Sequence, residues 1–477
     1  MNVDRSAGRP MNVDLLIAGG IVVTMDPERR VLPSGAVAVS GNRIVAVGDA
    51  AEVERACTPV RRIAASGRMV LPGFVNLHSH TGLTIMRGIG EDKGSASLYP
   101  PVTTVWDIMG PEDIHALSSL GFYELLRFGS TTVVENFRHM GAVADAAERL
   151  GVRAVLSEIV SDVDQPGIAA HGYRFDSRLG DAALGRGLEL ADRWHGRAGG
   201  RLTVQLSPHA PDFCSRELLE TIAGEARRRG LQITLHVAQT PREVEQVRRL
   251  HGRGSVELLD EIGMLGPHVI GAHCIYVSES EIARLAASGT GVAHNASINA
   301  KRGRITPAVE ILERGGTVGL GTDNYHGNIS EAWKFAISGA RVRTGDALRL
   351  TPMQVLEMAT VNGARALGRL HELGSLEPGK LADVVVVDLQ RPHFYPLIEP
   401  VGALVHNMVG NDVETVIVDG VVRMSDRRIP GIDLAAVRAE AQAAGEEVWS
   451  RLPEWDPLHR TATQMSPWSF PLIGDDS

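Results

Sequence analysis

Histidine and aspartate side chains stand at the ends of short apolar runs in the middle of the chain. His78 and His80 close the first run, His236 lies in the fifth, His273 ends the sixth and Asp323 ends the eighth. Alternate residues of a β-strand point to the same side, so His78 and His80 can aim two imidazoles at one point. Imidazoles and carboxylates that converge in this way are ligands of a divalent metal ion.

These residues predict hydrolysis by a metal-activated water. We expect His78, His80, His236 and Asp323 to hold one ion and to leave one position open for water. Zinc suits this mixture of donors best, and iron, cobalt and manganese also accept it. The ion would acidify the water toward neutral pH. Asp323 would take the remaining proton, and His273 would stabilise the charge that develops on the substrate.

The apolar runs are predicted to be eight strands that alternate with helices. Amphipathic patterns separate most of them, and Ser215 and Ser278 stand where helix N-caps are expected. Such a pattern indicates a (β/α)8 barrel, an α/β fold whose active site lies at the carboxyl ends of the strands. The predicted strands span residues 69–78, 131–136, 153–158, 202–207, 232–237, 268–273, 290–295 and 317–323.

Two β-rich regions enclose this middle part. Residues 14–49 and 382–424 contain short runs rich in Val and Ile, with Gly-Gly, Gly-Asn and Asp-Gly turns typical of hairpins. We expect the two ends to build one small β domain. The predicted boundaries are 12–70 and 371–430 for its two parts, 71–370 for the barrel and 431–477 for a C-terminal helix and tail. The first ten residues precede a second MNVD and are left out of this prediction.

Composition limits the partners of the protein. There are 48 Lys and Arg against 57 Asp and Glu, a net charge of −9, which argues against nucleic acid because phosphate binding needs clustered positive charge. The three cysteines are too few and too scattered for a disulfide framework. Apolar stretches stay far below 18 residues, and the N-terminus lacks the pattern of a secretory signal. We therefore expect a cytoplasmic enzyme with a small-molecule substrate and no membrane partner.

The motifs around these residues resemble the amidohydrolase superfamily. The similar branch contains cytosine deaminase, the adenosylhomocysteine and methylthioadenosine deaminases and the triazine chlorohydrolases. The resemblance covers about residues 12–425. It is carried by LPGFVNLHSHTGLTIMRG (71–88), SPHAPDFCS (207–215), LHVAQT (235–240), GAHC (271–274), AHNASINAKRG (293–303), GLGTDN (319–324) and LGSLEPGKLADVVVVD (373–388).

The resemblance implies the same four metal ligands and the same catalytic histidine as the residues do. It also implies that the β domain is a composite β-sandwich and that the protein is a homo-oligomer. The predicted fourth strand, VQLS, has no lysine that could be carboxylated to bridge two metals. We therefore expect a mononuclear site.

One residue departs from the family pattern. The fifth-strand motif of this branch usually runs His-x-x-Glu, and the Glu shuttles protons, whereas this chain has Gln239 three residues after His236. Glutamine forms similar hydrogen bonds but cannot carry a proton. Deaminating an aminoheterocycle is helped by protonating a ring nitrogen, and attack on a carbonyl does not need that step. We therefore expect Gln239, as a catalytic residue, to favour amides, ureas or carbamates.

Other residues near strand ends are candidates for substrate contact. The resemblance places one histidine against the substrate and one asparagine in a Ser-x-Asn-x-Lys run, and two aromatic side chains could grip a flat molecule. These four are His209, Asn299, Trp106 and Tyr325. Weaker candidates are Glu135, Arg138, His139 and Lys301. Cys274 follows His273 on the strand and so points to the opposite side, which favours packing over catalysis.

The sequence thus predicts a mononuclear metal-dependent hydrolase that attacks a non-peptide C–N bond of a small molecule. Deamination of a purine-, pyrimidine- or triazine-type aminoheterocycle is the second possibility, and hydrolytic displacement of halide or thiolate is a related one. A rival of another class is a catalytically silent assembly protein. That rival predicts eroded ligands, and all the proposed ligands are present here.

Overall fold

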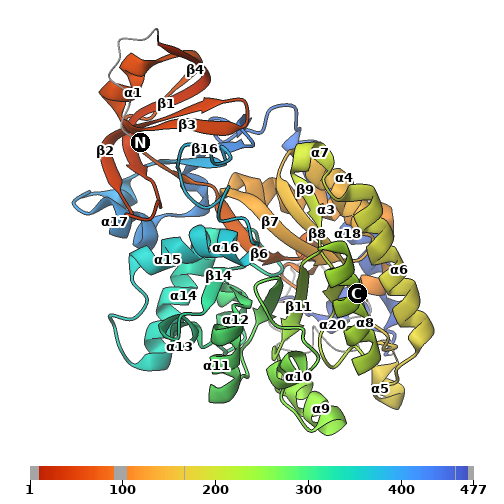
Figure 1. Cartoon of the computed structure of the whole chain (residues 1–477). Coiled ribbons are helices and arrows are strands. Elements are labelled where there is room, and N and C mark those ends of the chain that lie inside the picture. The colour runs from red at the N-terminus through yellow and green to blue at the C-terminus, as the bar shows by residue number, and fades with distance from the viewer. Residues whose placement is uncertain (1–9, 91–104, 166, 457, 471–477) are drawn as a thin grey trace.

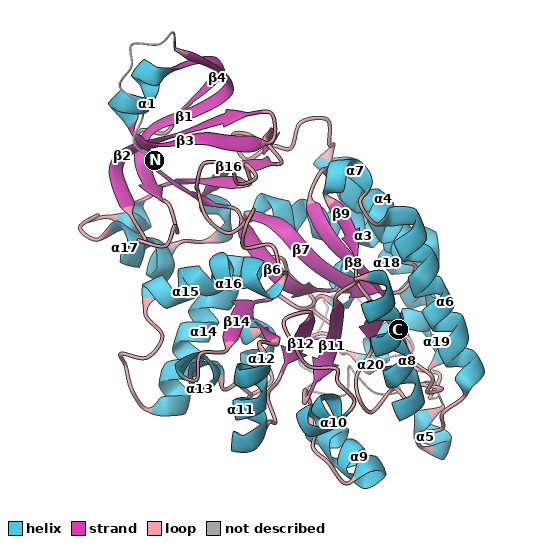
Figure 2. Cartoon of the chain, in the orientation of Figure 1, coloured by secondary structure: helices cyan, strands magenta, loops and turns pink. Residues whose placement is uncertain are grey.

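A computed structural model describes residues 10–90, 105–165, 167–456 and 458–470. A β domain stands beside a barrel whose strands are surrounded by helices (Figure 1). Figure 2 shows the helices on the outside of the barrel and the strands within it. Of the first ten residues, only Pro10 belongs to the described part of the chain.

The barrel is built from two parallel sheets that meet edge to edge. One has the order β10-β8-β7-β6 with β9 beside β8, and the other has the order β11-β12-β13-β14. Isolated bridges from Ser79 to Asp323 and from Leu206 to Ile233 join the sheets on both sides. With β9 and β10 taken as one interrupted strand, the described residues form eight barrel strands, which confirms the predicted barrel. The strands are β6 (Phe74–Ser79), β7 (Ser130–Phe137), β8 (Arg153–Val160), β9 (Leu202–Val204), β10 (Ser207–Pro208), β11 (Ile233–Val237), β12 (Val269–His273), β13 (Gly291–His294) and β14 (Thr317–Leu320).

Helices follow most of the barrel strands. Ser215 and Ser278 cap two of them, because their hydroxyls accept the backbone N–H of Leu218 and Glu281. The helices from the barrel part are η1 (Thr81–Met86), α2 (Val105–Ile108), α3 (Pro111–Arg127), α4 (Met140–Leu150), α5 (Ile168–His171), α6 (Ser177–Trp194), α7 (Arg197–Gly200), α8 (Arg216–Arg229), α9 (Pro241–His251), α10 (Ser255–Glu261), α11 (Glu279–Ser288), α12 (Ala296–Lys301), α13 (Ala308–Glu313), α14 (Ile329–Thr344), α15 (Pro352–Ala359) and α16 (Val361–Ala366).

The β domain takes strands from both ends of the chain. Its sheet has the order β17-β16-β15-β5-β1-β2-β3, with β4 beside β1. Strand β15 pairs antiparallel with β5, so a C-terminal strand completes a sheet begun by the N-terminal region. This confirms the predicted composite β domain, although its residue boundaries stay predictions. The strands are β1 (Met11–Val23), β2 (Val31–Ser40), β3 (Arg43–Asp49), β4 (Cys57–Ala64), β5 (Arg68–Pro72), β15 (Val384–Asp388), β16 (Val413–Val418) and β17 (Val421–Met424).

The remaining helices lie in the β domain and at the C-terminal end. Helix α18 packs against α3 on the outside of the barrel, and the predicted tail forms two short helices. These elements are α1 (Ala50–Ala56), η4 (Pro392–Phe394), α17 (Pro400–Asn407), η5 (Gly410–Asp412), α18 (Leu434–Ser450), α19 (Leu452–Trp455) and α20 (Ala462–Met465).

The predicted strand 69–78 is in fact two strands that belong to different domains. β5 lies in the sheet of the β domain, and β6 begins the barrel. The chain passes between them at Gly73, whose N–H donates to the carbonyl of Asp383. A Cβ at Gly73 would lie 2.1 Å from Oγ1 of Thr131, so a larger residue does not fit without displacing strand β7. Pro72 and Gly73 interrupt the apolar run at this crossing, but the sequence does not show that the two halves belong to different sheets.

A buried ion pair joins the barrel to the β domain. The guanidinium of Arg153, at the start of β8, binds both carboxylate oxygens of Asp383 at 2.9 and 3.0 Å. It also lies 3.1 Å from Oδ1 of Asp419. Arg153 is 1% exposed, so this charge depends on its partners.

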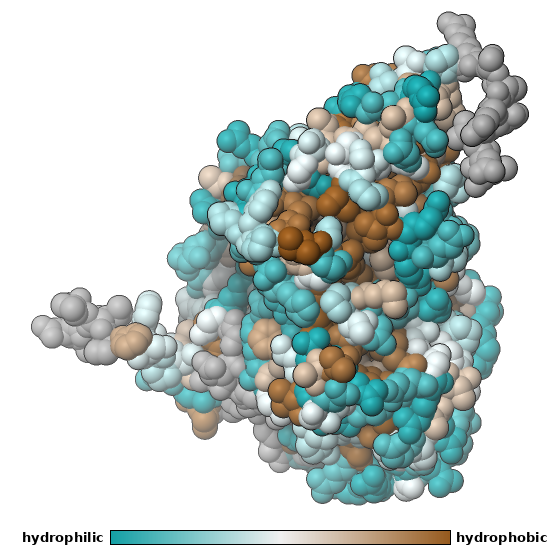
Figure 3. Space-filling view, turned by 90° about the vertical axis from the view of Figure 1, so that its left-hand side faces the viewer, coloured by the Kyte–Doolittle hydropathy of each residue, from teal (hydrophilic) through white to brown (hydrophobic). Residues whose placement is uncertain are grey.

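The surface is mostly polar, with some apolar side chains gathered on it. Figure 3 shows hydrophobic residues collected around the middle of one face and hydrophilic residues around them. Homo-oligomer formation stays a prediction. In the ranges that the structure describes, every helix is too short or too polar to cross a membrane.

Candidate active site

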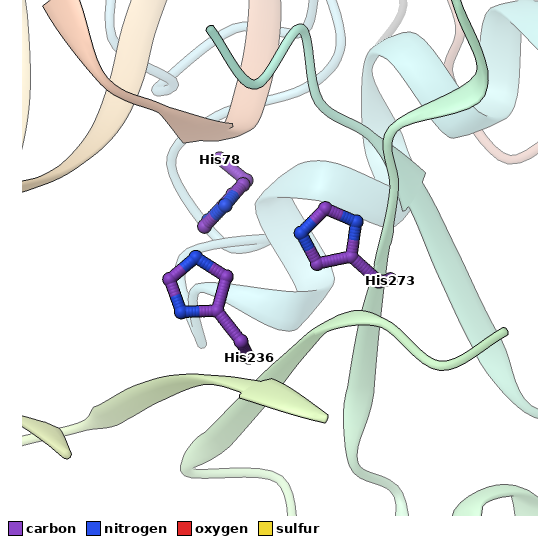
Figure 4. A group of neighbouring side chains, drawn as sticks. All are labelled: His78, His236 and His273. Carbon is purple, nitrogen blue, oxygen red and sulfur yellow. The ribbon is translucent and has the colours of Figure 1, made fainter. Parts of the chain in front are cut away.

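Four histidines and one aspartate meet at the carboxyl ends of the barrel strands. His78, His236 and His273 extend from β6, β11 and β12 toward a common point (Figure 4). His80 follows β6, and Asp323 follows β14. Ligand atoms within each of two overlapping groups, His78–His236–His273 and His78–His80–Asp323, lie within 4.8 Å of one another. The structure thus brings together all five residues that the sequence singled out for metal chemistry.

Distances between these groups suit a shared cation. Oδ1 of Asp323 lies 3.4 Å from Nε2 of His80 and 3.8 Å from Nε2 of His78. Nε2 of His236 lies 3.3 Å from Nε2 of His80. Two imidazole nitrogens face each other here, so at least one of them presents a lone pair. Converging lone pairs of this kind are a ligand set for a divalent ion.

Unsatisfied polar atoms support the same reading. Within the described residues, both ring nitrogens of His78 and Oδ2 of Asp323 are buried without a hydrogen-bond partner. Buried polar atoms are normally satisfied, so such a cluster marks a place where a ligand belongs. Burial, reinforced by the neighbouring imidazoles, holds the pKa of His78 well below its ordinary value. Burial also lowers the pKa of His80 to about 4, so these imidazoles are neutral.

Backbone groups orient two of the imidazoles. Nδ1 of His80 lies 2.5 Å from the carbonyl oxygen of Asn136, and Nδ1 of His236 lies 2.7 Å from that of His209. A carbonyl only accepts, so Nδ1 carries the proton in both rings and Nε2 is left as the donor atom for a metal. The two Nε2 atoms are the ones that point at the common centre.

The last strand brings Asp323 to this centre through an irregular turn. The N–H of Asp323 donates to the carbonyl of His78 at 2.9 Å, and its own carbonyl accepts the N–H of His80 at 3.1 Å. Its φ of 62° lies in the left-handed region, which aspartate tolerates better than most residues. His273 has a similar backbone, with φ 75°. Local strain is therefore concentrated at the site.

A narrow pocket, here called the catalytic pocket, opens beside this centre. Trp106, His209 and Gln239 of the predicted site residues line it, together with every ligand candidate except His78. The ring of His209 stacks on Phe213 at 4.6 Å, and the ring of Trp106 lies 6.1 Å from it. The complete lining is His80, Leu83, Trp106, Phe137, Ile159, His209, His236, Gln239, Asp323 and Asn324. Its walls are largely flat or apolar, which suits a ring-shaped substrate.

Two other predicted contacts lie outside the catalytic pocket. Oδ1 of Asn299 lies 3.2 Å from Nδ1 of His273, so Asn299 orients the predicted catalytic histidine. Tyr325 lines a small neighbouring cavity beyond His80 and Asp323, together with Arg87. A direct role of either residue in substrate binding stays a prediction.

The weaker candidates have structural partners. Glu135 accepts hydrogen bonds from the N–H and hydroxyl of Thr81, and burial raises its pKa to about 7. Lys301 pairs with Glu331 at 2.8 Å. His139 precedes α4 with φ 52°, and Arg138 lines a separate hollow. Cys274 is buried, and burial raises the pKa of its thiol, as expected for a packing residue.

Sequence reasoning missed several pocket residues. Leu83, Phe137 and Ile159 line the catalytic pocket but carry no chemical signature of their own. Phe137 and Ile159 each follow directly on a predicted strand, and that position was the one available signal. Nδ2 of Asn295 lies 3.3 Å from Nδ1 of His273, and this contact was also missed.

Gln239 is held in place through its backbone. Its N–H donates to Oε2 of Glu243 at 2.7 Å, and its carbonyl accepts from Arg304 at 3.0 Å. The preceding N–H, of Ala238, donates to Oε1 of Glu243 at 2.6 Å. The side-chain amide is thereby left beside the metal centre. Among the described lining residues, Asp323 is the one carboxylate in the catalytic pocket.

Comparison with known proteins identifies the family. Residues 69–423 match the model of the amidohydrolase family, which is most of the chain. The protein belongs to the amidohydrolase family. This amidohydrolase is therefore a hydrolase of C–N bonds other than peptide bonds, and the catalytically silent alternative finds no support.

Two curated relatives are similar along nearly their whole length. The 5'-deoxyadenosine deaminase of Methanosarcina acetivorans is 36% identical, over 92% of this chain and 99% of the relative. The 5-methylthioadenosine/S-adenosylhomocysteine deaminase of Pelotomaculum thermopropionicum is also 36% identical, over 90% of this chain and 97% of the relative. The amidohydrolase thus falls in the branch that the motifs resemble.

Solved structures are similar as well. An adenosine deaminase from Xanthomonas campestris with bound zinc has a TM-score of 0.85 and 28% identity, over 93% of this chain and 100% of that one. Atrazine chlorohydrolase from Arthrobacter aurescens, complexed with zinc, has a TM-score of 0.83 and 26% identity, over 90% and 100%. Both share the barrel with its additional domain.

Proposed function

We propose that this amidohydrolase removes an amino group from an aminoheterocycle of the adenine type, with zinc as its ion. The proposal rests on one observation: the five residues of the candidate metal centre lie beside a pocket that is lined by Trp106, Phe137 and His209. The two curated relatives, both of which are named as deaminases of adenosine-type compounds, support this substrate class. They favour the possibility that the sequence placed second.

The residues of the chain have distinct parts in such a reaction. When bound, the ion lowers the pKa of water and supplies a nucleophile near neutral pH. His78, His80, His236 and Asp323 would hold it. Asp323 would accept the proton of the attacking water and pass it to the leaving nitrogen. His273, oriented by Asn299, would stabilise the charge that develops on the substrate during the attack.

The side chains of the catalytic pocket would orient the ring. Trp106 and Phe137 line the catalytic pocket with aromatic rings whose centroids lie 6.1 Å apart, and this apolar part of the wall disfavours water. Exclusion of water strengthens each polar contact to the substrate. A flat heterocycle held there would place one exocyclic substituent toward Asp323.

A second candidate is hydrolysis of a carbonyl substrate, and one observation favours it. Gln239 lines the catalytic pocket where the family pattern has a proton-carrying glutamate, and an amide cannot carry a proton. Attack on an amide, urea or carbamate needs no protonated ring nitrogen. Asp323 alone would serve that reaction, by moving one proton from water to the leaving nitrogen.

A substrate panel decides between the two candidates. The zinc-loaded protein would be assayed for ammonia release from adenosine, 5'-deoxyadenosine, methylthioadenosine and aminotriazines. The same panel would include hydrolysis of small amides, ureas and carbamates, and chloride release from a chlorotriazine. We expect turnover of at least one aminopurine nucleoside. Turnover of carbonyl compounds alone would overturn the deaminase proposal, and chloride release from a chlorotriazine alone would assign the related displacement reaction.

Metal dependence is tested on the same substrates. Dialysis against a chelator should abolish turnover, and stoichiometric zinc should restore it. Iron, cobalt and manganese serve as the comparison metals. Full activity after metal removal, verified by elemental analysis, would contradict a metal-dependent reaction.

A further inference from the structure

Backbone hydrogen bonds and one stacked ring hold His209 in the wall of the catalytic pocket. It follows strand β10, its N–H donates to the carbonyl of Val160 at 2.8 Å, and its carbonyl accepts from His236. Its ring lies nearly parallel to that of Phe213, at an interplanar angle of 11°. Such a ring has little freedom to turn, so the positions of its two nitrogens are set by the fold.

Gln165 binds one of these nitrogens. Its side-chain Nε2 lies 2.8 Å from Nδ1 of His209. An amide nitrogen only donates hydrogen bonds, so Nδ1 must accept with its lone pair. A neutral imidazole with a lone pair at Nδ1 carries its proton at Nε2. Among the described residues, none forms a hydrogen bond with Nε2 of His209, so this N–H is available to a ligand in the catalytic pocket.

Gln165 itself lies behind His209, outside the catalytic pocket. It is 5% exposed and lines a separate hollow, here called the outer hollow, whose lining also includes Ser161 and Leu179. Ile159 lines both cavities, so the two are neighbours. Gln165 therefore reaches the catalytic pocket through the ring of His209 and not by its own contact.

We infer that Gln165 is a positioning residue that holds His209 in the Nε2–H form, so that His209 donates a hydrogen bond to a lone-pair atom of the substrate. The inference deepens the proposed function and rests on it for the identity of the acceptor, which is a ring nitrogen in an adenine-type substrate. This donor polarises the ring without transferring a proton. It partly replaces the polarisation that a glutamate at position 239 would supply.

A double-mutant cycle tests the coupling. Gln165→Leu should lower kcat/KM by about tenfold, because it leaves Nδ1 unpaired and frees the tautomer. In a His209→Ala background the same substitution should have almost no effect, since the two residues act as one unit. Leu179→Ala is the control, because Leu179 lines the outer hollow, whose lining does not include His209. A tenfold loss that persists in the His209→Ala background would overturn the inference.

Deaza analogues identify the acceptor atom. Adenosine analogues that lack N1, N3 or N7 would be compared on the wild type and on Gln165→Leu. We expect the wild type to show a lower kcat/KM for one of these analogues than for adenosine. Gln165→Leu should show no such difference for that analogue. Equal penalties on both proteins for all three analogues would contradict a donor set by Gln165.

The tautomer is measurable without any substrate. In zinc-loaded protein labelled with ¹⁵N-histidine, the His209 signals are those that disappear in His209→Ala. The wild type should show a protonated Nε2 and an unprotonated Nδ1, and Gln165→Leu should show a mixture. A proton on Nδ1 in the wild type would overturn the inference even if the substrate panel succeeds, whereas a failed panel with the expected tautomer would overturn only the proposed function.

Discussion

Oδ1 of Asp323 lies 3.4 Å from Nε2 of His80, although the two residues follow the last and the first strands of the barrel. The bridge between Ser79 and Asp323 closes the barrel at this point. The contact that closes the barrel therefore also brings two of the metal-ligand candidates together. A perturbation of either strand end should affect metal binding before it affects the rest of the molecule.

Asp323→Asn tests the central carboxylate. The variant keeps the size of the side chain and removes both the charge and the ability to take a proton. Turnover should fall by about a hundredfold or more, with weaker retention of zinc on dialysis. Kinetics and elemental analysis measure the two effects separately. Asp192→Asn, at a carboxylate whose side chain is 67% exposed, is the control, and unchanged turnover in the Asp323 variant would refute its role.

Gln239→Glu tests the departure from the family pattern. The backbone contacts of residue 239 to Glu243 and Arg304 do not involve the side chain, so the substitution should leave the fold intact. A carboxyl there can move protons, and we expect deamination of aminopurines to rise by about tenfold or more. Gln246→Glu, at a buried glutamine on α9, is the matched control. Lower deaminase activity in the Gln239 variant would show that the native amide is required.

Arg153→Met tests the link between barrel and β domain. The substitution leaves Asp383 buried and unpaired, which should lower the free energy of unfolding by about 3–5 kcal/mol. Denaturant titration measures this loss. Arg216→Met removes an exposed pair with Glu261 and should cost less than about 1 kcal/mol. Equal losses of unfolding free energy in the two variants would mean that the buried pair contributes no more to stability than the exposed pair.

Glu243 predicts a pH dependence of stability. Burial, followed by the nearby Asp212 carboxylate, raises its pKa from 4.5 to about 8. The folded protein therefore binds this proton more tightly than the unfolded chain, and the contribution of Glu243 to the unfolding free energy falls as pH rises from about 4.5 to about 8. Glu243→Gln does not titrate, so its stability relative to the wild type should improve over this range. Denaturant unfolding at several pH values measures the difference, and a constant difference would contradict the raised pKa.

The strands and the metal-centre residues could be predicted because their signals are local. A short apolar run marks a buried strand, and the position of His236 or His273 near its end follows from the order of residues alone. Barrel geometry then forces all strand ends to one rim. Pro72 and Gly73 mark a break within residues 69–78, but the assignment of the two halves to different sheets could not be predicted in this way, because both halves are apolar and buried.

The sequence by itself determined the barrel, the β domain built from both ends and the ligand types, because periodicity and residue chemistry are properties of short segments. The tertiary structure alone decided which side chains meet. It placed Asn299 against His273, Glu243 beneath the backbone of Gln239, and Gln165 behind His209. Hydrogen bonds of this kind join separate loops, and their partners follow from packing and not from spacing along the chain.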